Sequence, residues 1–151
     1  MQQQKVNIFW FRRDLRLTDN HGLHEALGLA YKDNGFYLTQ RAELTRLEDV
    51  DRDGKADFYK TIYSWPLSGN YHDYSYGPKF MDNGDMVVTL NLGWTGYGNS
   101  LVKWRGWMLK ITPEGEMTPF ATGLRSPAGF DINSEGDIFY TSIDIFLCHD
   151  D

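Results

Sequence analysis

The sequence predicts a mainly β protein built from repeated turn-and-strand units, with a short strand and helix at its N-terminal end. Glycine-containing turns recur roughly fifty residues apart, and each precedes a short apolar strand that ends in threonine. Aromatic residues make up 15% of the 151 residues, a content that favours strands. From about residue 34 to residue 141 the apolar residues show no helical spacing.

The N-terminal elements come first. Residues 6–11, VNIFWF, have the length and composition of a buried strand. A polar turn follows, in which Thr18 or Asp19 can cap a helix. The residues at helical spacing after that turn are Leu23, Ala26, Leu27 and Ala30. A strand, a turn and a helix form the first half of a βαβ unit, and no second parallel strand follows.

The repeat organises the rest of the chain. Its three copies are residues 33–39 (DNGFYLT), 82–89 (DNGDMVVT) and 134–141 (SEGDIFYT). Hairpins are expected between the copies, at residues 43–62 and 107–117. This period is expected of four-stranded propeller blades, so the sequence predicts a partial β-propeller of about two blades. A small open sandwich of the same strands is the alternative.

Three segments follow from these patterns. Residues 1–30 are the strand-helix segment, residues 31–142 the propeller-like segment, and residues 143–151 a truncated strand or tail. Two blades leave open sheet edges, which favour association with other chains. A homo-oligomer that closes these edges is therefore one open alternative.

Charge and composition exclude several classes of function. The formal net charge is −6, and residues after 29 carry −7 of it, so the body repels a nucleic-acid backbone. No apolar run is long enough to cross a membrane. Cys148 is the single cysteine, which excludes an intrachain disulfide. The first residues lack the features of a secretory signal, so the chain as written is expected in the cytoplasm.

An acidic loop has the spacing of a calcium site. Asp49, Asp51, Asp53 and Asp57 occupy positions one, three, five and nine around Gly54, as oxygen ligands do in calcium loops. Lys60 stands at the twelfth position, where a full EF-hand has glutamate. We predict a partial calcium loop here; the alternative is a solvated turn in which the aspartates cap their own backbone.

Further candidates lie in the other connections. His72, just before a strand, is a candidate general base, and Arg125, in a Pro-Gly turn, is a candidate partner for a carboxylate. Trp94, Trp104, Arg105 and Trp107 form either a stacking wall for a ligand or part of the core.

Residues 31–141 resemble the β-propeller of sorbosone and glucose dehydrogenase-like proteins that use pyrroloquinoline quinone (PQQ). The strings that carry the resemblance are LEDVDRDGKAD, PLSGNYHDYSYGPKFMDNGDMVVTLNLGW, WRGWMLKITPEGEMTPFATGLRSPAGF and NSEGDIFYT. The resemblance implies that His72 is the catalytic base and that Arg125 contacts quinone and substrate. It also implies a calcium ion, a sugar or aldehyde substrate and a periplasmic location.

The two ends of the chain resemble other families. FWFRRDLRLTDN, at residues 9–20, resembles the start of DNA photolyases and cryptochromes. The flavin site and the DNA-binding face of that family lie in a domain with no counterpart here, so FAD is not expected. Residues 144–150, DIFLCHD, resemble the start of a Toll/interleukin-1 receptor domain.

Four hypotheses of function follow. The first is an incomplete quinone-dependent sugar or aldehyde dehydrogenase-like propeller fragment that is not catalytic alone. The second is a noncatalytic sugar- or protein-binding β module. The third is a photolyase-like fragment, and the fourth is a chimeric sequence with no function of its own.

Overall fold

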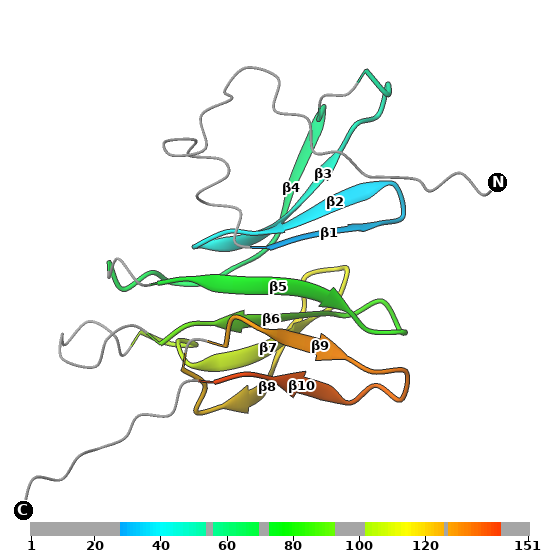
Figure 1. The fold of residues 1–151 in the computed structure, drawn as a ribbon. Helices are drawn as coiled ribbons and strands as arrows, with labels where there is room; N and C mark the ends of the chain where they lie inside the picture. The colour runs from blue at the N-terminus through cyan, green and yellow to red at the C-terminus, as the bar shows by residue number, and fades with distance from the viewer. Residues whose placement is uncertain (1–27, 54–55, 70–72, 93–101, 126, 143–151) are drawn as a thin grey trace, which may run out of the picture.

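In the computed structural model, residues 28–53, 56–69, 73–92, 102–125 and 127–142 are described, and they form ten β-strands (Figure 1). The strands are β1 (Gly28–Lys32), β2 (Gly35–Thr39), β3 (Glu43–Glu48), β4 (Phe58–Ser64), β5 (Ser75–Phe80), β6 (Met86–Leu90), β7 (Trp107–Ile111), β8 (Met117–Thr122), β9 (Phe130–Ile132) and β10 (Ile138–Tyr140). This part of the chain contains no helix that could cross a membrane.

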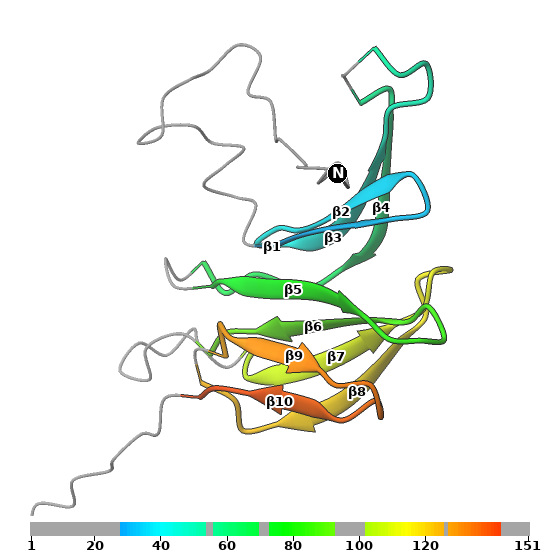
Figure 2. The ribbon, with the colours of Figure 1, turned by 45° about the vertical axis from the view of Figure 1, so that its right-hand side comes forward.

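The strands form two four-stranded sheets and a hairpin, all antiparallel. Strands β1 to β4 make the first sheet in chain order, β5 to β8 the second, and β9 pairs with β10 (Figures 1 and 2). The first strands of the three units lie together, because β5 contacts β1 and β2 on one side and β9 on the other. Consecutive up-and-down sheets whose first strands meet are the arrangement of propeller blades. The predicted fold class, a mainly β partial propeller of about two blades, is confirmed.

The first strands approach closely where glycines face each other. A Cβ atom added to Gly28 in β1 would collide with the carbonyl oxygen of Gly77 in β5. A Cβ on Gly77, whose φ is +104°, would lie 2.7 Å from the carbonyl oxygen of Val87. Only residues without side chains allow the inner strands to come this near.

The turn between β1 and β2 sets the register of the first sheet. Asp33 and Asn34 have positive φ values of 48° and 58°, and Lys32 pairs with Gly35 across them. A two-residue hairpin turn of type I′ requires positive φ at both positions, which Asp and Asn tolerate better than most residues. The turn predicted at the first repeat is therefore confirmed.

The helix predicted to reach Ala30 is wrong at its C-terminal end. Ala30 lies in β1 and pairs with Tyr37. The helix is predicted from the spacing of Leu23, Ala26, Leu27 and Ala30. Such spacing is a weak signal, and the strand pairing enforced by the turn overrides it at Ala30. The first sheet consequently begins at Gly28, ahead of the boundary predicted at residue 30. The strand predicted at residues 6–11, and the rest of the predicted helix, lie outside the described residues.

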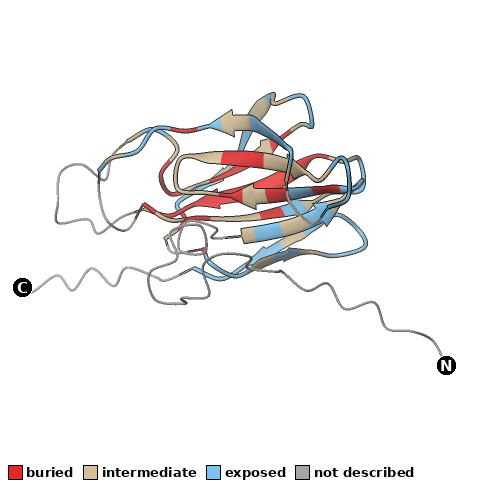
Figure 3. Ribbon diagram, turned by 90° about the horizontal axis from the view of Figure 1, so that it is seen from above, coloured by how far each residue is buried: buried red, intermediate tan, exposed pale blue. Residues whose placement is uncertain are grey.

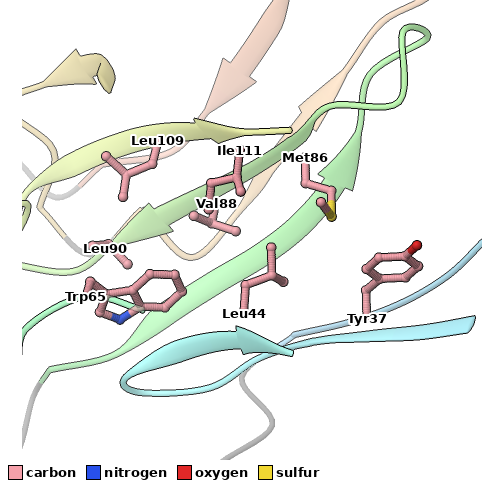
Figure 4. Close-up of a cluster of buried hydrophobic side chains, with 8 residues drawn as sticks. All are labelled: Tyr37, Leu44, Trp65, Met86, Val88, Leu90, Leu109 and Ile111. Carbon is pink, nitrogen blue, oxygen red and sulfur yellow. The ribbon is translucent and has the colours of Figure 1, made fainter. Parts of the chain in front are cut away.

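The main core lies between the two sheets. Tyr37 and Leu44 of the first sheet, with Trp65 just beyond it, point toward the second sheet (Figure 4). Five side chains of the second sheet meet them: Met86, Val88, Leu90, Leu109 and Ile111. All eight are at most 6% exposed, so this interface is a dry apolar layer.

A smaller core lies on the opposite face of the second sheet. Val87, Met108 and Leu124 pack there against Phe130, Ile132 and Ile138, among others. Because side chains alternate along a strand, β6 sends Met86 and Val88 to one sheet and Val87 to the hairpin. Every residue of β6 is buried, so both faces of this strand are covered. Figure 3 shows that the buried positions gather in the middle of the described strands.

Truncation of a core leucine tests this packing. Leu109→Ala should lower the free energy of unfolding by about 2–5 kcal/mol, because it leaves a cavity between the sheets. Urea denaturation measures the change. Leu67→Ala is the matched control, since Leu67 is 44% exposed and its truncation should cost far less. Equal losses for the two variants would contradict the assigned core.

Candidate functional site

The connections between strands fall at two ends of the sheets. Because all neighbouring strands are antiparallel, the connections β2–β3, β4–β5, β6–β7 and β8–β9 lie at one end, here called the loop end. The connections β1–β2, β3–β4, β5–β6, β7–β8 and β9–β10 lie at the other, here called the turn end. Figure 1 shows the loop end on the left and most of the turn end on the right.

One carbonyl oxygen joins three connections at the loop end. The carbonyl oxygen of Arg41, between β2 and β3, accepts a hydrogen bond from Trp65 Nε1 at 2.6 Å. It also accepts from Ser75 Oγ at 3.3 Å and from Arg105 Nη2 at 3.2 Å. These donors come from the end of the first sheet, the start of the second and the β6–β7 connection. The Arg41 carbonyl thus joins the two sheets at their loop end.

A buried ion pair stands beside this carbonyl. Arg105 Nε lies 3.7 Å from Asp73 Oδ1, and both side chains are 0% exposed. Arg105 also donates to the carbonyl oxygens of Tyr74 at 3.0 Å and of Pro66 at 3.5 Å. The carboxylate of Asp73 accepts from the backbone N–H of Ser68 at 2.7 Å and from its hydroxyl. These bonds compensate part of the loss of water, and Arg105 Nε itself has no hydrogen-bond partner.

Burial lowers the pKa of Arg105, and the nearby Arg41 lowers it further, whereas the carboxylate of Asp73 raises it. Because the ordinary value for arginine lies far above neutrality, Arg105 keeps its charge at physiological pH. The cation is fixed among main-chain carbonyls, so its role is to hold the connections together.

The tryptophan cluster belongs to the core at every described position. The rings of Trp104 and Trp107 meet edge to face with centroids 5.6 Å apart, and both pack against the main core. Arg105 between them is buried. Of the two interpretations of this cluster, the structure supports packing rather than a stacking wall. Trp94 lies outside the described residues.

Of the two predicted catalytic residues, Arg125 is described and His72 lies outside the described residues. Arg125 follows the buried Leu124 in the β8–β9 connection. Its backbone N–H donates to Ser142 Oγ at 3.0 Å, and that hydroxyl donates to the carbonyl oxygen of Arg125, also at 3.0 Å. Two residues on, the carbonyl oxygen of Pro127 accepts from Thr89 Oγ1 at 3.0 Å. Arg125 therefore stands on an anchored backbone at the loop end.

The acidic loop lies at the turn end, between β3 and β4. One carboxylate oxygen of each of Asp49, Asp51 and Asp57 lies within 4.8 Å of the others. Asp57 Oδ2 accepts from the backbone N–H groups of Val50 and Asp51, at 3.0 and 3.4 Å. The structure therefore brings together three of the four predicted ligands.

Asp53 contacts the other aspartates of this loop through its backbone N–H group. Its backbone N–H donates to Asp49 Oδ1 and to Asp51 Oδ1, both at 3.1 Å, and its carboxylate is not in the group of three. These bonds are those of aspartates that cap their own backbone, so the loop combines features of both interpretations of the sequence.

The structure separates the acidic loop from Arg125. The loop precedes β4 and Arg125 follows β8, which places them at opposite ends of the strands. β4 alone has seven residues and spans about 20 Å at about 3.3 Å per residue. A calcium ion held by this loop is therefore too far from Arg125 for the two to polarise one quinone carbonyl together.

Sequence reasoning did not identify Asp73, whose carboxylate at the loop end pairs with Arg105 and accepts hydrogen bonds from Ser68. The signal was present, because Asp73 lies among aromatic residues directly before a strand, in YHDYSY. Its basic partner is 32 residues away in the sequence, and no spacing rule links the two. Only the folded connections bring Asp73 and Arg105 together.

The comparisons with known proteins identify no family for this sequence. No family model matches this sequence, and no curated protein does. Four chains of solved structures match, among them the selenomethionine-substituted virginiamycin B lyase from Staphylococcus aureus. The match has 18% identity and a TM-score of 0.49, and covers 76% of this chain and 33% of the lyase chain. This chain thus spans about a third of that enzyme's length, and we infer neither fold nor activity from it.

Removal of the buried cation tests the ion pair at the loop end. Arg105→Met should destabilise the protein by about 3–5 kcal/mol, because it leaves the carboxylate of Asp73 buried without its counter-charge. Adding Asp73→Asn should recover part of the loss, so the double-mutant cycle in urea should show coupling. Lys110→Met breaks the more exposed pair with Asp85 and should cost less than about 1 kcal/mol. Additive effects of Arg105→Met and Asp73→Asn would contradict the pairing.

Proposed function

We propose that this chain is a segment of a quinone-dependent sugar or aldehyde dehydrogenase-like β-propeller, which binds ligand at its loop end and is not catalytic alone. One observation carries the proposal: Arg125 stands on an anchored backbone at the same end of the sheets as the connection that contains His72 in the sequence. The resemblance assigns the quinone-contacting arginine and the base to these two connections.

The position of Arg125 supports a role in anion recognition. A guanidinium group forms two parallel hydrogen bonds with a carboxylate, and a fixed backbone reduces the entropy lost when those bonds form. PQQ carries carboxylate groups, and as a bound cofactor it would accept the two electrons of an alcohol oxidation. His72 is proposed as the base because an imidazole accepts a hydroxyl proton near neutral pH.

The described residues do not complete a quinone site. Arg125 is the one predicted quinone contact among them, and the acidic loop is at the opposite end. The two sheets and the hairpin also form an arc rather than a closed ring (Figure 2). For these reasons we propose binding without turnover, and we assign no reaction step to the chain by itself.

We also propose that the acidic loop binds calcium and that the bound ion stabilises the β3–β4 connection. Carboxylate oxygens are the ligands that calcium prefers, and three of them already lie within 4.8 Å of one another. Asp51 and Asp57 are exposed, so we expect the weak affinity of open sites, with Kd about 10⁻⁴–10⁻³ M.

Ligand binding tests the role of Arg125. PQQ should bind the purified chain measurably in equilibrium dialysis. Arg125→Gln should weaken binding by roughly 10- to 100-fold, as expected when a charged hydrogen bond is lost. Lys60→Gln removes one positive charge at an exposed position of β4 and should leave the affinity unchanged. Equal effects of the two substitutions would contradict the assignment of Arg125 to PQQ binding. PQQ-dependent dye reduction with an aldose would contradict the proposal that the chain is not catalytic alone.

Calcium titration tests the acidic loop separately. At 100 times its Kd, calcium should stabilise the fold by about 2.7 kcal/mol, observed as a rise in Tm. Asp51→Asn should abolish most of this gain. Asp53→Asn is the matched control, because the Asp53 carboxylate is outside the group of three. A gain that is equal in both variants and in the parent chain would show that calcium acts elsewhere.

A further inference from the structure

The charged residues of this chain are divided unevenly between the two ends of the sheets. Each end is counted as its connections together with the strand residue on either side of each connection. The loop end carries four basic residues against two acidic ones: Arg41, Lys103, Arg105 and Arg125 against Glu43 and Asp73. The turn end carries twelve acidic residues against three basic ones, which are Lys32, Arg52 and Lys55. The loop end is therefore positive by two charges and the turn end negative by nine, in a chain of net charge −6.

Hydrogen bonds between connections bring the arginines of the loop end together. The carbonyl oxygen of Arg41 accepts from Arg105 Nη2 at 3.2 Å, which joins the β2–β3 connection to the β6–β7 connection. The carbonyl oxygen of Gly106 accepts from the backbone N–H of Leu124 at 3.0 Å, directly before Arg125. Three of the four connections at this end thus carry an arginine beside a bond to another connection.

The basic residues of the loop end differ in how far they reach solvent. Asp73 pairs with Arg105, and both side chains are 0% exposed, so this pair adds little net charge at the surface. Lys103 is exposed, and Arg41 and Arg125 are half-buried. The positive charge that a ligand would meet at the loop end therefore comes from these three residues.

The salt concentration decides which end of the sheets acts on a ligand at the loop end. Strands β6 and β4 have five and seven residues, so the two ends lie roughly 17–23 Å apart at about 3.3 Å per residue. The screening length is about 10 Å at 0.1 M salt and about 30 Å at 0.01 M. The acidic turn end is therefore largely screened at 0.1 M, whereas at 0.01 M both ends act on the ligand.

We infer that the loop end binds small polyanions, molecules with several carboxylate or phosphate groups, and that the acidic turn end weakens this binding at low salt. Guanidinium groups form paired hydrogen bonds with both kinds of oxygen. A local excess of positive charge also raises the concentration of anions beside it. The turn end has the opposite sign and repels the same ligands, so the charge pattern directs them to one end of the sheets.

Titration with citrate and with pyrophosphate, followed by amide shifts in ¹H–¹⁵N NMR spectra, tests the site. In about 150 mM NaCl, both anions should shift the loop-end amides saturably, among them those of Arg41 and Arg125, and leave the turn-end amides unchanged. Lys103→Glu should weaken binding by roughly 5- to 10-fold, because it replaces a nearby positive charge with a negative one. Lys60→Glu is the matched control: Lys60 is exposed in the turn-end half of β4, undergoes the same change of charge and should have little effect. The tighter of the two anions identifies the preferred charged group.

A second comparison tests the opposing effect of the turn end. Glu114→Gln combined with Glu135→Gln removes two exposed negative charges there. Citrate binding should strengthen by roughly twofold in about 10 mM NaCl and stay unchanged in about 150 mM, because only the longer screening length lets these charges act at the loop end. An equal change at both salt concentrations would contradict this long-range effect.

The inference concerns the same end of the sheets as the proposed function but does not rest on it, because citrate and pyrophosphate replace PQQ in its test. Citrate binding without PQQ binding would support the inference and contradict the proposed function. Equal Tm values for the parent chain and the variants establish that each is folded. The inference is overturned if neither anion binds, if the shifts occur at the turn end, or if Lys103→Glu and Lys60→Glu weaken binding equally.

Discussion

Burial of the second sheet from both sides is the constraint on which the rest of the structure depends. Strand β6 sends alternate side chains into two different cores, so it must be apolar along its whole length. The first sheet and the β9–β10 hairpin each have one core-facing side, and both need the second sheet to cover it. Without it, the apolar side of the first sheet would face water, and the two-stranded hairpin would be at best marginally stable.

Polar bonding at the loop end complements this apolar stack. The Arg41 carbonyl and the Arg105–Asp73 pair join connections from both sheets through hydrogen bonds that link side chains with main-chain groups. Hydrogen bonds between the connections are directional, so they add to the close packing of the apolar layer a further constraint on how the two sheets align. The same bonds fix Arg41, Asp73 and Arg105 relative to one another. The acidic loop lies at the other end of the sheets, apart from these bonds.

Several elements were predictable because their signals are local. The glycine-containing turns and the threonines that end the repeated strands predicted β2, β6 and β10, and the hairpin expected at residues 107–117 is the one that β7 and β8 form. The acidic loop was predictable in the same way, and three of its four aspartates do come together. Ala30 shows where local reasoning failed: its spacing suggested a helix, but pairing with Tyr37 across a two-residue turn placed it in a strand.

The sequence by itself determined the class of fold, the repeat and the chemistry of the candidate residues, because turn geometry and side-chain alternation act over a few positions. Only the tertiary structure decided which candidates share an end of the sheets, and which aromatic residues are core. It buried Trp104, Arg105 and Trp107 wholly or in part, and it placed the acidic loop far from Arg125. It also left the side chains of Tyr59 and Phe139 largely exposed. The physical reason is that burial and proximity arise from the packing of sheets, which joins residues at separations that no local pattern records.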